Sequence, residues 1–400
     1  MELGKAFELI KNDELLEIVG NLIRIPSHSH TPGQEKEIAK FVEQTLKNWA
    51  FDVILQEVEP ERFNVITRLK GQSNGKSLLL NGHLDTVPAG EGMVNAYHPV
   101  VKEGRLYGRG SADMKAALGA MLYVLFLLKK TEISLLGDLY FSGVVGEESG
   151  GTGTRFLVQN GFKADYAVIG EPTDLNLVRS HKGVLQLKAI IRGKAAHAAL
   201  PEKGANAILK MAEFIQRVEK EVVPKLKKRR QASVGHSTLN FGTIQGGTQT
   251  NMVADLCILE IDRRWVKAET EAQVASEIAG LLYEVCRDNP GFAVEITSLL
   301  PPGGYFGPFE ISEDHKLIKM AKQALEQAGI LPKIGGMQGW TDAATLMKAG
   351  IPTVLLGPGS LDQAHTNNEF VDLGQLILAV KCYLALTKII CGWKMNQPRA

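Results

Sequence analysis

Short apolar runs typical of buried strands alternate along the chain with longer stretches whose apolar residues recur at helical spacing. Strands are expected at 51–55, 63–69, 77–81, 138–145, 166–169 and 353–356. Helices are expected at 6–25, 34–48 and 114–130, and the last of these is rich in Ala and Leu, which favour helices. Because strands alternate with helices, we expect an α/β fold with a largely parallel sheet and helices on both faces.

The middle of the chain has a different rhythm. Strands are expected at 184–191, 238–245, 254–264 and 292–298, and helices at 205–222 and 271–287. The order strand, helix, strand, strand, helix, strand is that of a ferredoxin-like module. At 400 residues the chain is long enough for two domains. We therefore expect an inserted α+β domain at 183–297 and a catalytic domain formed by 1–182 and 298–400.

Composition narrows the class of function. Charged residues make up 22% of the chain and the net charge is +1, so we expect neither nucleic acid nor a membrane as partner, and a small-molecule substrate instead. The basic run at 225–231, KLKKRRQ, is interpreted as a solvated loop. The longest apolar helix that we expect, at 116–128, is too short to span a bilayer.

The cysteines and the N-terminus bear on the compartment. Four cysteines lie far apart without a Cys-x-x-Cys pair, which favours reduced thiols over a disulfide framework or a thiolate zinc site. The first residues mix Glu, Lys and Asp among apolar positions, unlike a signal peptide. We therefore expect a cytoplasmic protein.

Residues able to bind a metal ion stand at the ends of several expected elements. His83 and Asp85 lie two residues apart after the strand at 77–81, so extended backbone would point them the same way. Alone, such a pair is more often hydrogen-bonded within a loop. Four further candidates change that balance: Asp113 at a helix start, Glu148 and Glu171 after two other strands, and His365 after the last strand. Two histidines and three carboxylates suit zinc, cobalt or manganese rather than calcium.

Five ligands can hold two metal ions if one carboxylate bridges them, and Asp113 is the candidate bridge. Glu147 and Glu148 are adjacent, and adjacent side chains diverge in loop or extended backbone. One of the two is therefore expected to bind metal, and the other to face the reacting water as a general base.

Six motifs occur in order along the chain: GHLDTVP, GRGSADMK, GEESGGTGT, GEPT, AHAALPEKGANAI and GPGSLDQAHTNNE. Over nearly its whole length the chain resembles the metallopeptidase family of acetylornithine deacetylase, succinyl-diaminopimelate desuccinylase and carboxypeptidase G. The resemblance implies a zinc-peptidase catalytic domain with an inserted lid and dimerisation domain. It also implies a homodimer joined through the inserted domain.

The same resemblance implies two zinc ions per chain, with cobalt or manganese as alternatives. One ion would be held by His83, Asp113 and Glu171, and the other by Asp113, Glu148 and His365. Asp85 would orient His83 through its carboxylate. Glu147 would be the general base for a water that bridges the metals. The family also has a cis peptide after the bridging Asp, which would place one between Asp113 and Met114.

The resemblance further implies residues that contact the substrate. His197 matches a histidine that the neighbouring subunit brings to the reacting carbonyl. Asn251 and Arg264 match positions that hold the substrate carboxylate, a task suited to a guanidinium group. Gly339, Thr341 and Gly359 are further expected contacts. The chain departs from the family pattern at Trp265 and Trp340, where smaller residues are usual, and either Trp can also be explained by packing.

The expected function is hydrolysis of the amide bond of an N-acyl amino acid, because the GPGSLDQAH stretch is closer to the acetylornithine deacetylase pattern than to the desuccinylase pattern. A dipeptidase or carboxypeptidase is the alternative within the same chemistry. A metal-binding protein without turnover is a third hypothesis, and the presence of Glu147 argues against it.

Overall fold

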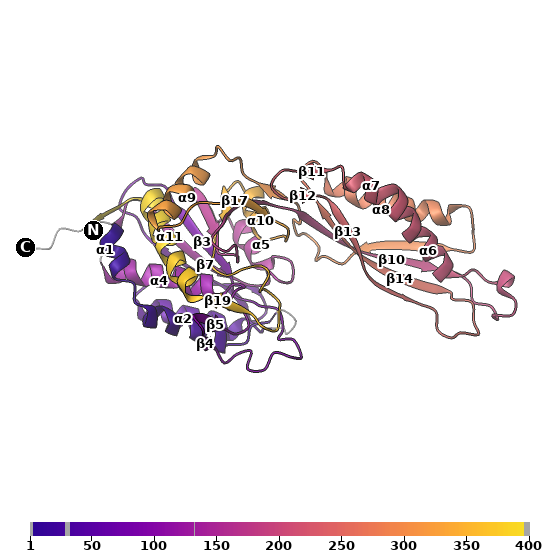
Figure 1. Cartoon of the computed structure of the whole chain (residues 1–400), viewed down its shortest axis with the longest axis horizontal. Helices are drawn as coiled ribbons and strands as arrows, with labels where there is room; N and C mark the ends of the chain where they lie inside the picture. The colour runs from indigo at the N-terminus through magenta and orange to yellow at the C-terminus, as the bar shows by residue number, and fades with distance from the viewer. Residues whose placement is uncertain (1–2, 29–32, 132, 396–400) are drawn as a thin grey trace, which may run out of the picture. The chain divides into compact units, whose positions relative to one another are not determined.

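The computed structural model describes residues 3–28, 33–131 and 133–395 (Figure 1). The chain divides into two compact units. The large unit comprises Met1–Arg179, Ile311–Gly335 and Thr341–Ala400, and the inserted unit comprises Ser180–Glu310 and Gly336–Trp340. The inserted unit extends beyond the expected 183–297 at both ends and also includes Gly336–Trp340.

The large unit is built on a sheet with strand order β1-β2-β7-β3-β8-β18-β9. The bounds are β1 Val53–Glu59, β2 Arg62–Leu69, β3 Leu78–His83, β7 Leu139–Val144, β8 Tyr166–Ile169, β9 Leu177–His181 and β18 Thr353–Leu355. The central strands β7, β3, β8 and β18 are parallel, whereas β1, β2 and β9 pair antiparallel. The expectation of a largely parallel sheet is therefore confirmed for the centre of the sheet.

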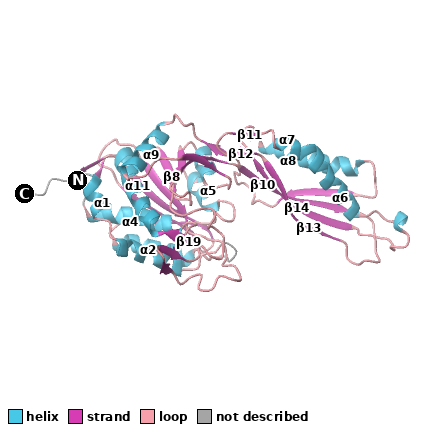
Figure 2. Cartoon of the chain, in the orientation of Figure 1, coloured by secondary structure: helices cyan, strands magenta, loops and turns pink. Residues whose placement is uncertain are grey.

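Helices cover this sheet (Figure 2). Their bounds are α1 Leu3–Glu8, α2 Asn12–Arg24, α3 Lys36–Asn48, α4 Lys115–Lys130, α5 Thr152–Gln159, α9 Lys316–Gln327, α10 Ala343–Lys348 and α11 Leu373–Cys391. Every residue of β3 is buried, as expected of a strand covered on both faces. The short strands β4 Val100–Lys102, β5 Arg105–Tyr107 and β19 Phe370–Asp372 form a separate sheet, and β6 Ile133–Leu135 pairs with β20 Trp393–Met395.

Helix α11 corrects one expectation from the sequence. It is longer than the stretch at 116–128, which the sequence predicts as the longest apolar helix, and its length and composition alone would allow it to cross a bilayer. In the structure α11 packs against α4 and α9, and most of its residues are buried (Figure 1). Its apolar character is explained by its place in the core of the large unit.

The inserted unit consists of a four-stranded antiparallel sheet and helices. Its main elements are β10 Gly183–Arg192, α6 Ala207–Arg217, β13 Thr238–Gly246, β14 Leu256–Trp265, α8 Glu271–Arg287 and β15 Ala293–Ser298. The strand order β13-β14-β10-β15 matches a ferredoxin-like connectivity. Alternate residues of β14 pack with α6 and α8 in one apolar core, which includes Trp265. Packing therefore accounts for Trp265.

The basic run at 225–231 was expected to be a solvated loop; Lys225, Lys227, Lys228 and Arg230 are exposed, but only 227–229 lie outside helices and strands. After a π-helical turn at Val218–Val222, helix α7 occupies Val223–Leu226, and β11 Arg230–Gln231 pairs with β12 Gly235–His236. Between them, Arg229 donates to Glu269 at 2.9 Å and to Glu277 at 2.8 Å. These opposite charges anchor the run to the start of α8. The remaining short elements are the 3-10 helix Pro201–Lys203, β16 Phe309–Glu310 and β17 Ile334–Met337.

Candidate metal centre and active site

The carboxyl ends of the central parallel strands place the candidate ligands at one edge of the sheet. His83 is the last residue of β3, Glu148 follows β7, and Glu171 follows β8. Because β7, β3 and β8 are adjacent and parallel, their ends meet where ligands bind in open α/β sheets. Asp113 precedes α4, and His365 lies in the loop after β18.

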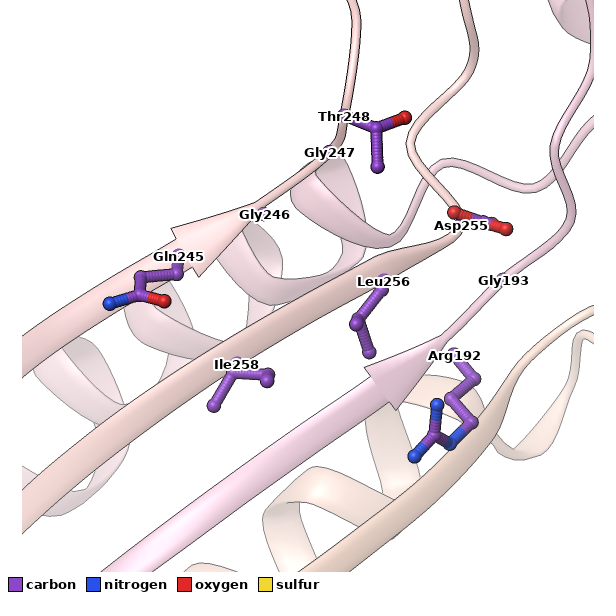
Figure 3. A pocket seen from close by; sticks show the side chains of 9 residues that line it. All are labelled: Arg192, Gly193, Gln245, Gly246, Gly247, Thr248, Asp255, Leu256 and Ile258. Carbon is purple, nitrogen blue, oxygen red and sulfur yellow. The ribbon is translucent and has the colours of Figure 1, made fainter.

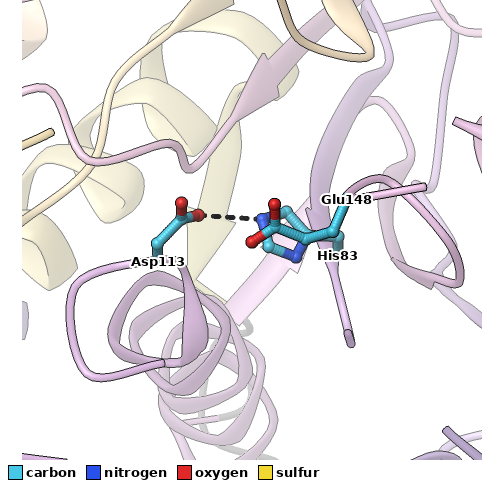
Figure 4. A group of neighbouring side chains, drawn as sticks. All are labelled: His83, Asp113 and Glu148. Carbon is cyan, nitrogen blue, oxygen red and sulfur yellow. Dashed lines mark hydrogen bonds and ion pairs between the residues drawn. The ribbon is translucent and has the colours of Figure 1, made fainter. Parts of the chain in front are cut away.

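The carboxylate of Asp113 lies between two imidazoles. Its Oδ1 is 2.9 Å from Nε2 of His83, and its Oδ2 is 3.3 Å from Nε2 of His365. The same nitrogen of His365 is 3.1 Å from Oε1 of Glu148. One ligand atom from each of His83, Asp113 and Glu148 lies within 4.8 Å of the others (Figure 4). The peptide bond between Asp113 and Met114 is cis, as expected.

Glu171 is outside that group of three ligand atoms, and its charge acts on His83 and Asp113. Its side chain is buried, and its Oε1 has no hydrogen-bond partner among the described residues. Burial and then the charge of Asp113 raise the pKa of Glu171 well above its ordinary value. An unpartnered carboxylate oxygen beside other carboxylates is costly unless a positive charge compensates it.

The two histidines carry part of that positive charge. Burial lowers the pKa of His83, but the hydrogen bond to Asp113 and the charges of the surrounding carboxylates together raise the pKa well above the ordinary value. Hydrogen bonds to Asp113 and Glu148 raise the pKa of His365 to about 10. Two imidazoles and three carboxylates, one with an unpartnered buried oxygen, fit a divalent transition-metal ion as a donor set.

Glu147 lies beside the cluster and is not among its short contacts. Burial, followed by the charge of Glu171, raises the pKa of Glu147 well above its ordinary value. A carboxylate with a raised pKa is better matched to taking a proton from water than an ordinary one. The adjacent Glu148 is the one that contacts His365, so the two neighbouring side chains differ in their surroundings.

Asp85 holds this loop in place. Its fully buried carboxylate accepts hydrogen bonds from the backbone N–H groups of Glu147, at 3.2 Å, and Glu148, at 3.0 Å. Nδ1 of His83 lies 2.8 Å from the main-chain carbonyl of Asp85 and 3.7 Å from its Oδ1. The carboxylate was expected to orient His83, but the short hydrogen bond runs to the carbonyl instead.

Two acidic residues beside the cluster were not identified from the sequence. Asp342 is buried, accepts a hydrogen bond from Thr154 at 2.6 Å, and its charge raises the pKa values of Glu147 and Glu171. Glu369 is buried and accepts a hydrogen bond from the backbone N–H of Asp113 at 3.1 Å. The sequence signal for Asp342 is its place in GWTDA before a helix, and that for Glu369 is its place at the end of the GPGSLDQAHTNNE motif, four residues after His365.

In the inserted unit, the loops that carry His197 and Asn251 lie side by side. The backbone N–H of Ala198 donates to the carbonyl of Asn251 at 3.0 Å, and His197 forms a β-bridge with Met252. His197 and Asn251 are both exposed. The structure therefore brings these two candidates together on one surface of the inserted unit.

Arg264 lies elsewhere in the inserted unit. Its guanidinium donates from Nε and Nη2 to the carboxylate of Asp262, at 2.7 and 3.0 Å. Asn251 precedes the first residue of β14, Leu256, whereas Arg264 is next to its last. At about 3.4 Å per residue, Leu256 and Arg264 are roughly 27 Å apart. One chain therefore does not bring Arg264 together with His197 and Asn251.

The three remaining substrate candidates have contacts inside their own units. The ring of Trp340, next to Gly339, lies 5.3 Å from that of Phe306. The buried Thr341 accepts a hydrogen bond from Ala343 N–H at 3.2 Å. Gly359 has a φ of +86°, and a Cβ there would lie 3.1 Å from Cα of Ala112. Gly359 therefore supports the segment that leads into Asp113.

A pocket of about 440 Å³ lies at one end of the inserted sheet (Figure 3). Its described lining comes from the ends of β10 and β13 and the start of β14: Arg192, Gly193, Gln245, Gly246, Gly247, Thr248, Asp255, Leu256 and Ile258. Neither His197 nor Asn251 belongs to this lining. The described lining of the pocket therefore contains none of the candidate substrate contacts.

Comparison with known proteins identifies the family. The model of peptidase family M20/M25/M40 matches residues 79–388. Acetylornithine deacetylase of Proteus mirabilis is 33% identical over 379 residues, covering 91% of this chain and 93% of that protein. N-formyl-4-amino-5-aminomethyl-2-methylpyrimidine deformylase of Bacillus subtilis is 30% identical over 411 residues, covering 96% of each.

Solved structures agree in fold. A tripeptidase of Staphylococcus aureus superposes with a TM-score of 0.81 at 27% identity, covering 96% of this chain and 99% of that one. A dinuclear metal-binding M20 peptidase of Bacillus subtilis superposes with a TM-score of 0.71 at 18% identity, covering 97% and 99%, and so shares the fold. The resemblance carried by the sequence motifs is confirmed: the chain belongs to peptidase family M20/M25/M40 and is a metal-dependent amidohydrolase.

Proposed function

We propose that this protein hydrolyses the amide bond of an N-acyl amino acid, in the manner of an acetylornithine deacetylase, with two divalent metal ions per chain. The observation that carries the proposal is the position of Asp113. Its carboxylate offers one oxygen toward His83 and the other toward His365. A carboxylate placed in this way between two sets of ligands is suited to bridge two ions.

In this proposal His83, Asp113 and Glu171 would hold one ion, and Asp113, Glu148 and His365 would hold the other, with zinc as the first choice and cobalt or manganese as alternatives. Bound ions of this kind supply Lewis acidity and lower the pKa of water. Glu147 takes a proton from the water while the oxygen of the water attacks the amide carbon. Glu147 then gives that proton to the nitrogen as the carbon–nitrogen bond breaks, which releases the acid and the amine.

We also propose that His197 acts on the site of a partner subunit in a homodimer. The separation of His197 and Asn251 from Arg264 supports this, because a substrate the size of an amino acid cannot span roughly 27 Å along β14. A partner that supplies His197 and Asn251 would complete a site that uses Arg264 of the first chain. His197 would then donate a hydrogen bond to the developing oxyanion.

The inserted unit offers a surface for that dimer. Strand β13 is at the end of the strand order and pairs, among the described strands, with β14 alone. Ile244 on β13 and Leu209 on α6 are large apolar side chains that are 53% and 69% exposed. An exposed edge strand with neighbouring apolar side chains is suited to pairing with a second copy.

The proposed substrate class follows from the relatives. The names of two of them describe removal of a small acyl group from an amine, acetyl in one and formyl in the other. Arg264, and with it Asn251 from the partner, would hold the substrate carboxylate, and Gly339, Thr341 and Gly359 would form further contacts. The likeness to a tripeptidase structure favours a short peptide as the second candidate substrate.

The test is a substrate screen on metal-free protein supplied with zinc, cobalt or manganese. N-acetylated and N-succinylated amino acids, N-formylated amines, dipeptides and tripeptides would be compared by kcat/KM. We expect the highest kcat/KM for an N-acetyl amino acid with a free carboxylate, and no turnover without metal. A preference for peptides would replace the deacylase by a peptidase. Absence of hydrolysis of every amide would overturn the proposed function.

We place the protein in the cytoplasm, again as a proposal. All four cysteines, Cys257, Cys286, Cys382 and Cys391, are free and buried. Burial raises the pKa of each thiol, which keeps it in the unreactive form. Free thiols of this kind are typical of a reducing compartment.

A further inference from the structure

Glu369 holds the segment that leads into Asp113. Its Oε1 accepts hydrogen bonds from the backbone N–H groups of Ala112, at 2.9 Å, and Asp113, at 3.1 Å. Its Oε2 accepts from the backbone N–H of Gly110, at 3.0 Å, and from the guanidinium of Arg109. One buried carboxylate thus fixes four donors within five consecutive residues.

The burial of this group makes these contacts obligatory. Glu369 and Arg109 are each 1% exposed, so neither charge can turn to bulk water. Hydrogen bonds to a charged acceptor are stronger than neutral ones, and removing one partner of a buried ion pair leaves the other charge uncompensated. Glu369 therefore fixes the segment together with hydrogen bonds of the segment's own backbone, such as that from the N–H of Ser111 to the carbonyl of Gly108 at 3.1 Å.

Glu369 is also tied to the loop of a second candidate ligand. It lies four residues after His365, and the next residues pair with β5, with Phe370 opposite Tyr107 and Val371 opposite Leu106. The backbone N–H of Gly108 donates to the carbonyl of Glu369 at 3.2 Å. The same residue therefore joins the segment of Asp113 to the segment of His365, which both approach one ion in the proposed site.

We propose that Glu369 is a positioning residue that sets the backbone of Asp113 relative to His365, so that the Asp113 carboxylate reaches both metal ions. It touches neither substrate nor metal and acts through the N–H groups of Ala112 and Asp113. This inference rests on the proposed two-metal function. Loss of the charge of Glu369 should weaken the binding of the ion proposed to be held by Asp113, Glu148 and His365. The binding of the other ion should be weakened less.

The test compares Glu369→Gln with Glu269→Gln in the full chain. Glu269 is a matched control in the inserted unit, because it is also buried and binds an arginine, Arg263, and a backbone N–H, that of Val266. Zinc affinity would be measured by titration of metal-free protein. Hydrogen exchange of the peptide covering 109–114 would be measured without metal.

We expect Glu369→Gln to lower the affinity for the zinc proposed to be held by Asp113, Glu148 and His365 by about 10- to 100-fold. This is the usual effect of removing a group that orients a ligand. Exchange at 109–114 should become faster even without metal, and excess zinc should restore part of kcat. Glu269→Gln should lower the melting temperature while leaving zinc affinity and exchange at 109–114 unchanged. If Glu369→Gln does not fold, Glu369→Asp would be tested in its place, because it keeps the charge. Its shorter side chain should lower the affinity for the same zinc ion.

The outcomes separate the two proposals. If the wild-type protein binds fewer than two ions, the two-metal function fails before Glu369 is considered. If the wild type binds two ions and the Glu369 variant does the same with equal affinity and unchanged exchange, only the role of Glu369 is overturned. The role is also overturned if Glu269→Gln weakens zinc to the same extent, because the effect would then be one of general stability.

Discussion

The carboxylate of Asp85 lies under the loop of Glu147 and accepts a hydrogen bond from its backbone N–H at 3.2 Å. The next N–H, that of Glu148, is bound by the other oxygen at 3.0 Å. Two neighbouring backbone donors held by one buried carboxylate fix the direction in which both side chains leave the chain. This contact can therefore assign different roles to two adjacent glutamates.

Asp85→Asn is expected to lower kcat and metal affinity by about 10- to 100-fold, because an amide nitrogen would face one of the two backbone N–H groups. Asp165→Asn is a matched control. Asp165 also accepts a backbone hydrogen bond, from Ser77 at 2.9 Å, just before β3, at the opposite end from His83. It should leave kcat and metal content unchanged. Equal losses in both variants would show that the effect of Asp85 is on folding alone.

Removal of metal should destabilise the protein. An ion present at 100 times its dissociation constant stabilises the folded state by about 2.7 kcal/mol. We expect the melting temperature to fall with a chelator and to be restored by zinc, cobalt or manganese but not by calcium, because two of the five donors are imidazoles, whereas calcium takes oxygen ligands. A melting temperature that does not respond to a chelator would argue against bound metal.

Gly359→Ala tests the close approach to Ala112. At a φ of +86° any other residue is strained by about 1 to 3 kcal/mol, and the new Cβ would press on the segment before Asp113. Gly329→Ala is the control, since its φ is +84° and a Cβ there meets nothing within 4 Å. Both should melt at a lower temperature, and only Gly359→Ala should bind metal more weakly. If metal binding is unchanged, Gly359 is needed only for its backbone conformation and does not support the segment before Asp113.

The dimer is tested by mixing two inactive variants, His197→Ala and Glu147→Gln, under conditions where subunits exchange. In a mixed dimer, the His197→Ala chain keeps its metal ligands and Glu147, and the Glu147→Gln chain supplies His197. One complete site therefore forms, and activity should return. His98→Ala, a change at another exposed histidine, should be active by itself. If exchange is demonstrated and no activity returns, His197 does not act across subunits.

Sequence patterns predicted regular elements well where the apolar spacing is strong. The bounds of β8 and α8 were predicted to the residue, because turn residues or an N-terminal cap mark their ends. The short strands β9 and β16 were missed, since each pairs over only a few residues where the chain passes between the two units. The cysteine pattern and the near-neutral charge served to exclude classes of function.

In the candidate site, too, residues placed by a general property of the fold were predicted, and residues placed by contacts distant in sequence were not. His83, Glu148 and Glu171 were found because parallel strand ends converge, which is a general property of the fold. Glu369 was missed because its role depends on backbone N–H groups more than 250 residues away in sequence, and no local pattern encodes such a contact. The sequence also could not predict that His83 forms its hydrogen bond with the carbonyl of Asp85 rather than with its carboxylate.

Glu147→Gln tests the central claim most directly, because it removes the base and keeps the shape of the side chain. We expect metal content to stay at two ions per chain, while kcat on the best substrate of the screen falls by about 10²-fold or more, since an amide cannot take the proton of the attacking water. If the variant retains two ions and a near-normal kcat, Glu147 is not the base and the proposed mechanism is wrong.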